Sequence, residues 1–317
     1  MREASSPPEP QPQEDDRLDG LARGALTAAV AVARELGLDV GQPTVLANDQ
    51  NLLVHLSPSP VVARVATRIA WSRPDPAAWL AREVAVASHA AANGGPAVPP
   101  TDLVDPGPHT KDGYAMTLWT YVEADGELAS ESEVGEALGQ LHRSLRDFPR
   151  SALPDRVPVH AQIENGLAAL TRDRVVDAGT LERLAAMHRQ VSRKLAAVRG
   201  TDGVIHGDAH PWNLLHTQAG WRWIDMEETG FGAQEFDLAV LASKVDDPQA
   251  ALARYASTVG HAVVRRETLT PFQRIRELET VVWGLGMAVT DPSFRDTAED
   301  RLMRLLEQPP EAASSGC

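Results

Sequence analysis

The 317-residue sequence lacks the features on which several classes of protein depend. Its one cysteine is Cys317, so no disulfide can form within the chain, and a reducing cytosol suits it. No apolar run approaches the roughly 18 residues of a transmembrane helix, and residues 1–19 lack the apolar core of a signal peptide. We therefore expect a soluble cytoplasmic protein with no membrane partner.

Positive charge is also scarce. The chain has 30 Lys and Arg residues against 44 Asp and Glu, a net charge of −14. Lysine itself occurs only at positions 111, 194 and 244, so arginine carries most of the positive charge. A chain this acidic does not offer the basic patches that bind nucleic-acid phosphates. We expect no nucleic-acid partner.

One segment points to chemistry. It is the run His206-Gly207-Asp208-Ala209-His210-Pro211-Trp212-Asn213. Residues 214–216 and 221–224 read as the two strands of a hairpin, which returns Asp225 to a position beside Asn213. Carboxylate and amide oxygens at a hairpin mouth suit Mg²⁺, which takes few protein ligands and fills its other positions with water and phosphate oxygens.

The periodicity of apolar residues and the turn residues predict an α+β chain. In the first part we expect two helices, at 20–37 and 76–93, and five strands, at 44–46, 52–56, 61–65, 103–104 and 114–121. Further on we expect helices at 133–146, 160–172, 180–199, 248–264, 271–289 and 297–307. The hairpin strands are the only ones predicted there. The Pro-rich, acidic residues 1–17 and the residues 308–317 are predicted to be disordered tails.

The chain resembles the aminoglycoside phosphotransferase and choline kinase-like family in three segments. These are the run from His206 to Asn213, the pair Ile224-Asp225, and the later Phe236-Asp237-Leu238-Ala239. The resemblance implies a two-lobed protein-kinase-like fold. A small β-rich N-lobe at 18–121 would bind the nucleotide, 122–127 would be a connector, and a mostly helical C-lobe at 128–307 would carry the catalytic loop and the acceptor site. The implied reaction is Mg²⁺-dependent transfer of the ATP γ-phosphate to a small-molecule hydroxyl, with GTP as the alternative donor.

Family position assigns roles to several residues. Asp208 corresponds to the catalytic base, and Asn213 and Asp225 to the Mg²⁺ ligands. In the family a lysine or an arginine on the third strand contacts the nucleotide phosphates. The early strands of this chain have no lysine, so Arg64 takes that position, with Glu83 on the following helix as its partner.

The nucleotide-capping loop departs from the family pattern. Ala47-Asn48-Asp49-Gln50-Asn51 contains no glycine, so we expect Asn48 and Asn51 to supply turn geometry and amide donors to the phosphates. The adenine is expected against the backbone of residues 119–123, beside Trp119 and Tyr121.

The histidines leave an alternative open. His206, Asp208 and His210 would suit a metallohydrolase, because imidazole and carboxylate bind zinc, but no other histidine has a convincing ligand spacing. We favour a structural role, in which His206 braces the loop and His210 orients it. Asp237 is predicted to cap the next helix and to steady the same loop.

The acceptor is less defined by the sequence. Side chains that would form an acidic pocket with an aromatic wall are Glu227, Glu228, Glu277, Glu279, Asp291 and Trp283. Such a pocket suits a cationic acceptor, so an aminoglycoside-type antibiotic, inactivated by phosphorylation, is the first candidate. A metabolite kinase of the choline, homoserine or sugar type is the alternative. A non-catalytic nucleotide-binding protein is disfavoured because Asp208, Asn213 and Asp225 are all present. We expect a monomer or a homodimer.

Overall fold

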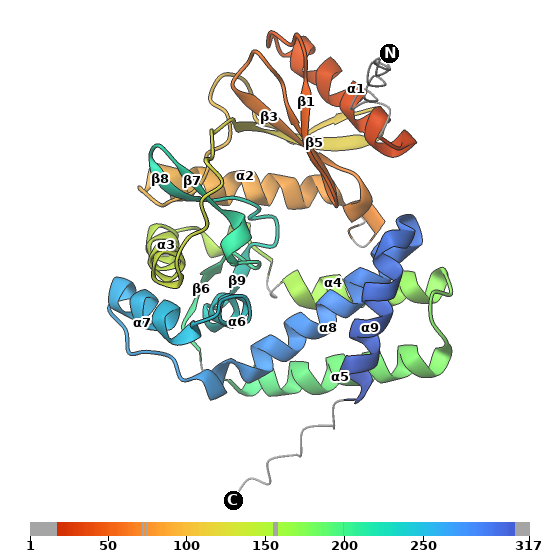
Figure 1. Cartoon of the computed structure of the whole chain (residues 1–317), viewed down its shortest axis with the longest axis vertical. Helices are drawn as coiled ribbons and strands as arrows, with labels where there is room; N and C mark the ends of the chain where they lie inside the picture. The colour runs from red at the N-terminus through yellow and green to blue at the C-terminus, as the bar shows by residue number, and fades with distance from the viewer. Residues whose placement is uncertain (1–17, 72, 74, 155–157, 199, 308–317) are drawn as a thin grey trace, which may run out of the picture.

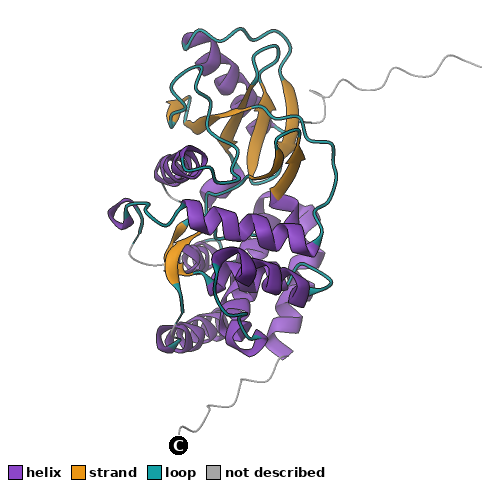
Figure 2. Ribbon diagram, turned by 90° about the vertical axis from the view of Figure 1, so that its left-hand side faces the viewer, coloured by secondary structure: helices purple, strands orange, loops and turns teal. Residues whose placement is uncertain are grey.

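The computed structural model describes residues 18–71, 73, 75–154, 158–198 and 200–307. The predicted tails at 1–17 and 308–317 lie outside the described residues. Figure 1 shows two lobes, with a sheet at the N-terminal end of the molecule and helices at the other. The second view places most of the strands above a stack of helices (Figure 2). The α+β, two-lobed prediction is confirmed.

The sheet lobe is built on five antiparallel strands in the order β1-β2-β3-β5-β4. The strands are β1 (Thr44–Asn48), β2 (Asn51–His55), β3 (Val61–Ala66), β4 (His109–Lys111) and β5 (Tyr114–Thr120). Helix α1 (Gly20–Glu35) covers the sheet with buried Ala22, Ala25, Ala29 and Val32, which recur at helical spacing. Helix α2 (Pro76–Ala92) contacts β5 and lies between the sheet and the helical lobe (Figure 1).

The strand predicted at residues 103–104 is wrong. Those residues form a bend, Leu103 is 56% exposed, and the partner of β5 is β4. The cause is the two-residue turn of Asp112 and Gly113, whose φ angles of 49° and 84° fit a hairpin connection that pairs Lys111 with Tyr114. Because of this turn, the three residues before it, His109–Lys111, form the strand that pairs with β5.

The helical lobe begins after residues 121–130, which contain no helix or strand. Its helices are α3 (Glu131–Ser144), α4 (Pro158–Arg172), α5 (Ala178–Ala197), α6 (Glu235–Ala242), α7 (Pro248–Val259), α8 (Arg266–Thr290) and α9 (Arg295–Glu307). Short 3₁₀ turns lie at Arg68–Trp71, Arg150–Ala152, Pro211–Asn213 and Pro292–Phe294. Helix α8 is central, because it packs against α4, α5, α6 and α9. No helix among the described residues has the length and apolar character needed to cross a membrane.

The strands of this lobe were predicted incompletely. The hairpin of β7 (Leu214–Thr217) and β8 (Gly220–Trp223) is present, but β6 (Asp202–Ile205) also pairs with β9 (Gly230–Ala233). Both extra strands have four residues, and β9 contains two glycines, which disfavour strands. They pair with each other and so enclose residues 206–229 between them.

The two lobes share backbone contacts at the hairpin. The Val98 amide donates to the carbonyl of Trp223 at 3.0 Å, and the Trp223 amide donates to that of Pro96 at 2.6 Å. Trp223 is fully buried. Strand β8 is therefore bonded on one side to β7 and on the other to the segment that follows α2.

Candidate active site

Asp237 anchors the loop that follows β6. Its carboxylate accepts hydrogen bonds from the backbone amides of His206 (2.7 Å) and Gly207 (2.8 Å) and contacts the His142 Nε2 at 2.8 Å. It is completely buried. The predicted capping role is corrected: Asp237 lies within the first turn of α6, and Gln234 is the N-cap residue. Asp237 does steady the loop, because it accepts two of its amide protons.

Gly207 is required at the turn of this loop. Its φ is +91°, which side chains disfavour, and a Cβ would lie 2.3 Å from the carbonyl oxygen of Glu228. The absence of a side chain lets the loop lie directly against the turn at residues 227–228 that leads into β9. This contact sets the direction in which Asp208 leaves the backbone.

His206 braces the loop, as predicted. Its Nε2 lies 3.0 Å from the carbonyl oxygen of Ile224, and its Nδ1 accepts from the Asp208 amide at 3.2 Å. The proton is therefore assigned to Nε2, and burial lowers the pKa of the ring, which favours the neutral form. With both nitrogens engaged, His206 has no nitrogen left for a metal. The only cluster of three possible ligand residues within the described residues is Asp125, Glu127 and His216, which includes none of His206, Asp208 and His210, so the metallohydrolase alternative loses support.

Asp208 contacts an arginine that the sequence did not suggest. Its Oδ1 lies 2.5 Å from the Arg276 Nη2 of α8, and its Oδ2 lies 3.5 Å from the His210 Nε2. Burial alone would raise the pKa of Asp208, but the Arg276 guanidinium and His210 outweigh burial and hold the pKa well below its usual range. Asp208 is therefore ionised at neutral pH.

Asn213 and Asp225 lie next to one another, as the hairpin predicted. The Ile224 amide donates to the Asn213 carbonyl at 3.0 Å, and Leu214 pairs with Trp223. The Asn213 Nδ2 donates to the Asp208 carbonyl at 3.0 Å, which leaves its Oδ1 as the atom able to bind a cation. Asp225 has a φ of +61°, uncommon for a residue with a side chain.

Arg64 lies among three carboxylates at the inner end of the sheet. Its Nη2 is 2.5 Å from Asp225 and 2.8 Å from Glu227, and its Nε is 3.5 Å from Glu83. Burial acts to lower the pKa of Arg64, but the three carboxylates outweigh burial and raise the pKa above its ordinary value. Arg64 therefore remains charged. The expected pair with Glu83 is present. Burial also raises the pKa of Glu83 to about 8, although Arg64 opposes the shift, and Glu83 accepts the Met226 amide at 3.0 Å.

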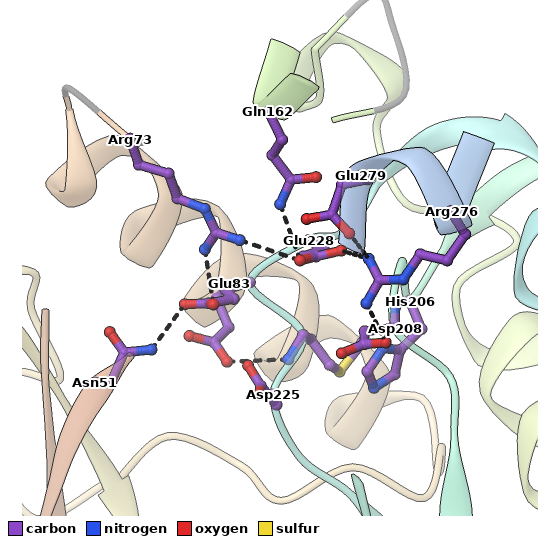
Figure 3. A network of polar contacts seen from close by, with 12 residues as sticks. Asn51, Arg73, Glu83, Gln162, His206, Asp208, Asp225, Glu228, Arg276 and Glu279 are labelled. Carbon is purple, nitrogen blue, oxygen red and sulfur yellow. Dashed lines mark hydrogen bonds and ion pairs between the residues drawn. The ribbon is translucent and has the colours of Figure 1, made fainter. Parts of the chain in front are cut away.

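A second arginine, Arg73, extends this network. It contacts Glu227 at 2.7 Å and Glu228 at 3.2 Å, and the Gln162 Nε2 donates to Glu228 at 2.9 Å. Glu228 also lies 2.6 Å from Arg276, so the polar network continues from Arg73 to Asp208 (Figure 3). Six carboxylates meet three guanidiniums in it. Burial raises the pKa of Glu83, Glu228 and Glu279, so fewer of these carboxyls are ionised at neutral pH than the count of six suggests.

The two asparagines of the β1–β2 turn are engaged elsewhere. The Asn48 Oδ1 accepts from Arg68 at 3.1 Å, and the Asn51 Nδ2 donates to the buried Glu227 at 3.2 Å. The carbonyl of Gln50 accepts from the Thr67 hydroxyl and the Ile69 amide. The turn is thus fastened to residues 67–69, and the phosphate-capping role of Asn48 and Asn51 stays a prediction.

An apolar slot of about 140 Å³ lies between the sheet and the hairpin. Leu53 and Val62 of the sheet face Leu215 and Trp223 of the hairpin, and the slot ends at Arg64, Glu83 and Asp225. Both predicted adenine neighbours, Trp119 and Tyr121, line it. The Trp119 Nε1 donates to Thr117 at 2.9 Å, and the Tyr121 amide donates to Pro60 at 2.9 Å.

A larger cavity of about 550 Å³ has Asp208, His210 and Arg276 in its lining. Of the predicted acidic pocket, Glu228, Glu277, Glu279 and Trp283 line it. Glu227 instead lies with Arg64 and Arg73, and Asp291 caps the 3₁₀ turn after α8. Arginines and a lysine were missed: Arg276, Arg301, Arg304 and Lys244 are in the lining.

The sequence contained one signal for Arg276. It lies on α8 beside the buried Ile275, three residues before Glu279 and near the buried Leu278. Arg276 and Glu279 are oppositely charged residues on an apolar helix face, and such a pair indicates a buried ion pair. Arg73, which is 1% exposed and lies in the segment before α2, had no comparable signal.

Comparisons with known proteins agree with this geometry. The model of a family described as the phosphotransferase enzyme family matches residues 39–269. A choline/ethanolamine kinase family protein from Mesorhizobium loti is 19% identical, with a TM-score of 0.60 over 91% of this chain and 96% of that one. An amicoumacin kinase, solved with AMP-PNP, Ca²⁺ and its ligand, is 14% identical, with a TM-score of 0.62 over 86% and 93%.

A third similar structure is APH(2″)-IIIa in complex with GDP and kanamycin. It is 15% identical, with a TM-score of 0.61 over 89% of this chain and 98% of that one. At these identities the likeness concerns the fold. A comparison with curated protein sequences finds no significant match.

Proposed function

The chain belongs to the phosphotransferase enzyme family and is a small-molecule kinase; we propose that it transfers the γ-phosphate of ATP to a hydroxyl of its acceptor, with Mg²⁺ as cofactor. One observation carries the proposal. Asp225 lines the end of the apolar slot, Asp208 lines the acceptor cavity, and Asn213 lies between them, bonded to the Asp208 carbonyl. A nucleotide held in the slot would direct its phosphates toward Asp208.

Asp208 is assigned to the acceptor hydroxyl. Phosphoryl transfer asks the protein chiefly for positioning and charge neutralisation. A carboxylate that Arg276 keeps ionised accepts the hydroxyl proton in a hydrogen bond and thereby orients the oxygen. Its low pKa makes Asp208 a weak base, which suits a reaction in which the hydroxyl is aligned rather than deprotonated early.

The nucleotide and metal sites fit the residues present. The Asn213 Oδ1 and the Asp225 carboxylate would hold Mg²⁺, which supplies charge neutralisation of the phosphates when bound. Arg64, at the end of the slot, would contact the non-transferred phosphates, with Glu83 positioning it. Trp119, Tyr121 and the apolar lining of the slot would contact the purine. Of the similar structures, the amicoumacin kinase was solved with AMP-PNP and APH(2″)-IIIa with GDP, so GTP is the donor to compare with ATP.

The cavity favours a metabolite acceptor over an aminoglycoside. An aminoglycoside, with several ammonium groups, needs carboxylates that are not already neutralised. Here Glu228 and Glu279 contact Arg276, at 2.6 and 3.3 Å, and Glu277 contacts Arg274 at 3.0 Å. Antibiotic inactivation therefore receives less support from the structure than a metabolite kinase does.

The experiment is an ATP-consumption screen of aminoglycosides, macrolides, nucleosides, amino alcohols, sugars and sugar acids, repeated with Asp208→Asn. The variant should lose at least about a thousandfold in turnover, since the aligning carboxylate is removed, and should keep its affinity for Mg·ATP. Asp202→Asn, an exposed carboxylate on β6, is the matched control. Retained turnover in Asp208→Asn would remove Asp208 from the reaction.

A further inference from the structure

Three cations line one part of the acceptor cavity. Lys244 follows α6 and is exposed at the rim, while Arg301 (partly buried) and Arg304 (exposed) lie one turn apart on α9. None of the three side chains makes a hydrogen bond or an ion pair with any residue in the described part of the chain. Asp208 and Arg276 lie in the lining of the same cavity.

The carboxylates of the cavity do not compensate these cations. Glu228 and Glu279 are engaged with Arg276, and Glu277 with Arg274. Burial also raises the pKa of Glu279 to about 7, against the opposing effect of Arg276, so this carboxyl is only partly ionised at neutral pH. The lining holds four cations, Lys244, Arg276, Arg301 and Arg304, against four carboxyls, Asp208, Glu228, Glu277 and Glu279, and burial raises the pKa of Glu228 as well as that of Glu279. The balance is therefore positive, and the carboxyls are engaged at Arg276 and Arg274 rather than at Lys244, Arg301 and Arg304.

The pKa of Lys244 is consistent with an excess of positive charge in the cavity. Burial lowers the pKa of Lys244, and the neighbouring Arg276 and Arg301 lower it further, while Asp208 offsets only part of the shift. Three uncompensated cations are unexpected on a chain with a net charge of −14, in which acidic neighbours are plentiful. An anion in the cavity would relieve their mutual repulsion.

We propose that the acceptor carries an anionic group, a carboxylate or a phosphate, that Lys244, Arg301 and Arg304 bind while its hydroxyl faces Asp208. This inference rests on the proposed function, because it takes the cavity beside Asp208 as the acceptor site. Two guanidiniums and an ammonium match the oxygens of carboxylate and phosphate, and the guanidinium fork adds orientation to charge. The anion thereby selects the acceptor and sets its position.

The test measures binding of four sugars that share a ring and differ in charge. The protein is first saturated with AMP-PNP and Mg²⁺, so that the nucleotide site is filled, and then titrated by calorimetry with glucose, glucosamine, glucuronate and glucose 6-phosphate. The two anionic sugars should bind at least about tenfold more tightly than glucose, and glucosamine should bind no better than glucose. Arg301→Gln and Arg304→Gln should each weaken anion binding roughly tenfold.

The control is Arg295→Gln, which removes an exposed arginine from the same helix but outside the cavity and should change nothing. Equal binding of the charged and neutral sugars, no binding of either anion, or anion binding unaffected by both cavity variants would overturn the inference. AMP-PNP affinity, measured separately, keeps the two proposals apart. Failure to bind AMP-PNP with Mg²⁺ would count against the kinase proposal, whereas normal nucleotide binding without charge preference would overturn only this inference.

Discussion

Arg276 sets the charge of Asp208, and replacing it with glutamine should expose a pH dependence that the native pair suppresses. The two side chains are 2.5 Å apart, and the Asp208 carboxylate is 20% exposed. Burial alone raises the pKa of Asp208, and Arg276 is the largest of the effects that lower it. Without the guanidinium, the pKa must therefore rise.

The size of the change follows from Coulomb's law. Two unit charges about 4 Å apart at an effective dielectric of about 20 attract by about 4 kcal/mol, equivalent to about three pH units in pKa. Because Arg276 also contacts Glu228 and Glu279, we expect the pKa of Asp208 to rise by about two pH units in Arg276→Gln. The variant should lose kcat as the pH falls toward the raised pKa of Asp208, while the native enzyme should show no such loss from this group.

The same substitution changes stability in a defined direction. A carboxyl with a depressed folded-state pKa contributes stability above its unfolded pKa of about 3.9, and this contribution is lost as the pH falls through the folded value. At pH 7 Arg276→Gln should therefore lower the free energy of unfolding by about 3 kcal/mol, because it leaves buried carboxylates unpaired.

The assay is kcat for the acceptor found in the screen, between about pH 3 and 8.5, because a rise of about two pH units from a strongly lowered pKa places the acid limb below about pH 4.5; denaturant unfolding is measured at pH 7. Arg274→Gln, which breaks a more exposed pair with Glu277 on the same helix, is the control and should keep the native profile. A flat acid limb in Arg276→Gln, with intact folding, would refute the reasoning that this arginine determines the ionisation of Asp208.

Three further changes test the site. Asp237→Ala removes the acceptor of two loop amides and the partner of His142, so the free energy of unfolding should fall by about 3 kcal/mol or more in denaturant titrations; an unchanged midpoint would contradict the anchoring role. Gly207→Ala places a Cβ 2.3 Å from the Glu228 carbonyl at a φ of +91°, and should cost about 2 kcal/mol or more and most of kcat; native-like activity would show that the loop can shift. Arg64→Gln should raise the nucleotide KM at least about tenfold and the acceptor KM little, measured by initial rates with each substrate varied; an effect on the acceptor alone would refute phosphate binding.

The catalytic loop could be predicted because its information is local. Asp208 and Asn213 lie five residues apart, and a hairpin of ordinary length brings Asp225 back to them. The pairing of Arg64 with Glu83 was also accessible, since each occupies a fixed place on a predicted strand or helix. Family resemblance supplied the roles, and the hairpin supplied the proximity.

The partners of these residues could not be predicted, because they come from distant helices. Arg276 is 68 positions from Asp208 and reaches it only because α8 packs against α6. The acidic pocket was predicted from carboxylates alone, whereas Arg274 and Arg276 of α8 pair with Glu277, Glu228 and Glu279. The strand at 109–111 was missed because a turn, rather than apolar alternation, fixes it.

The backbone bonds between β8 and the segment after α2 bear on how the protein folds. Strand β8 has partners on both sides only while both lobes are present, and Val86, Ala87 and Ala90 of α2 belong to the core of the helical lobe. A fragment that began after the connector would expose a strand edge and lose part of its core. The lobes are therefore not independent folding units, and the whole chain should unfold in a single cooperative transition.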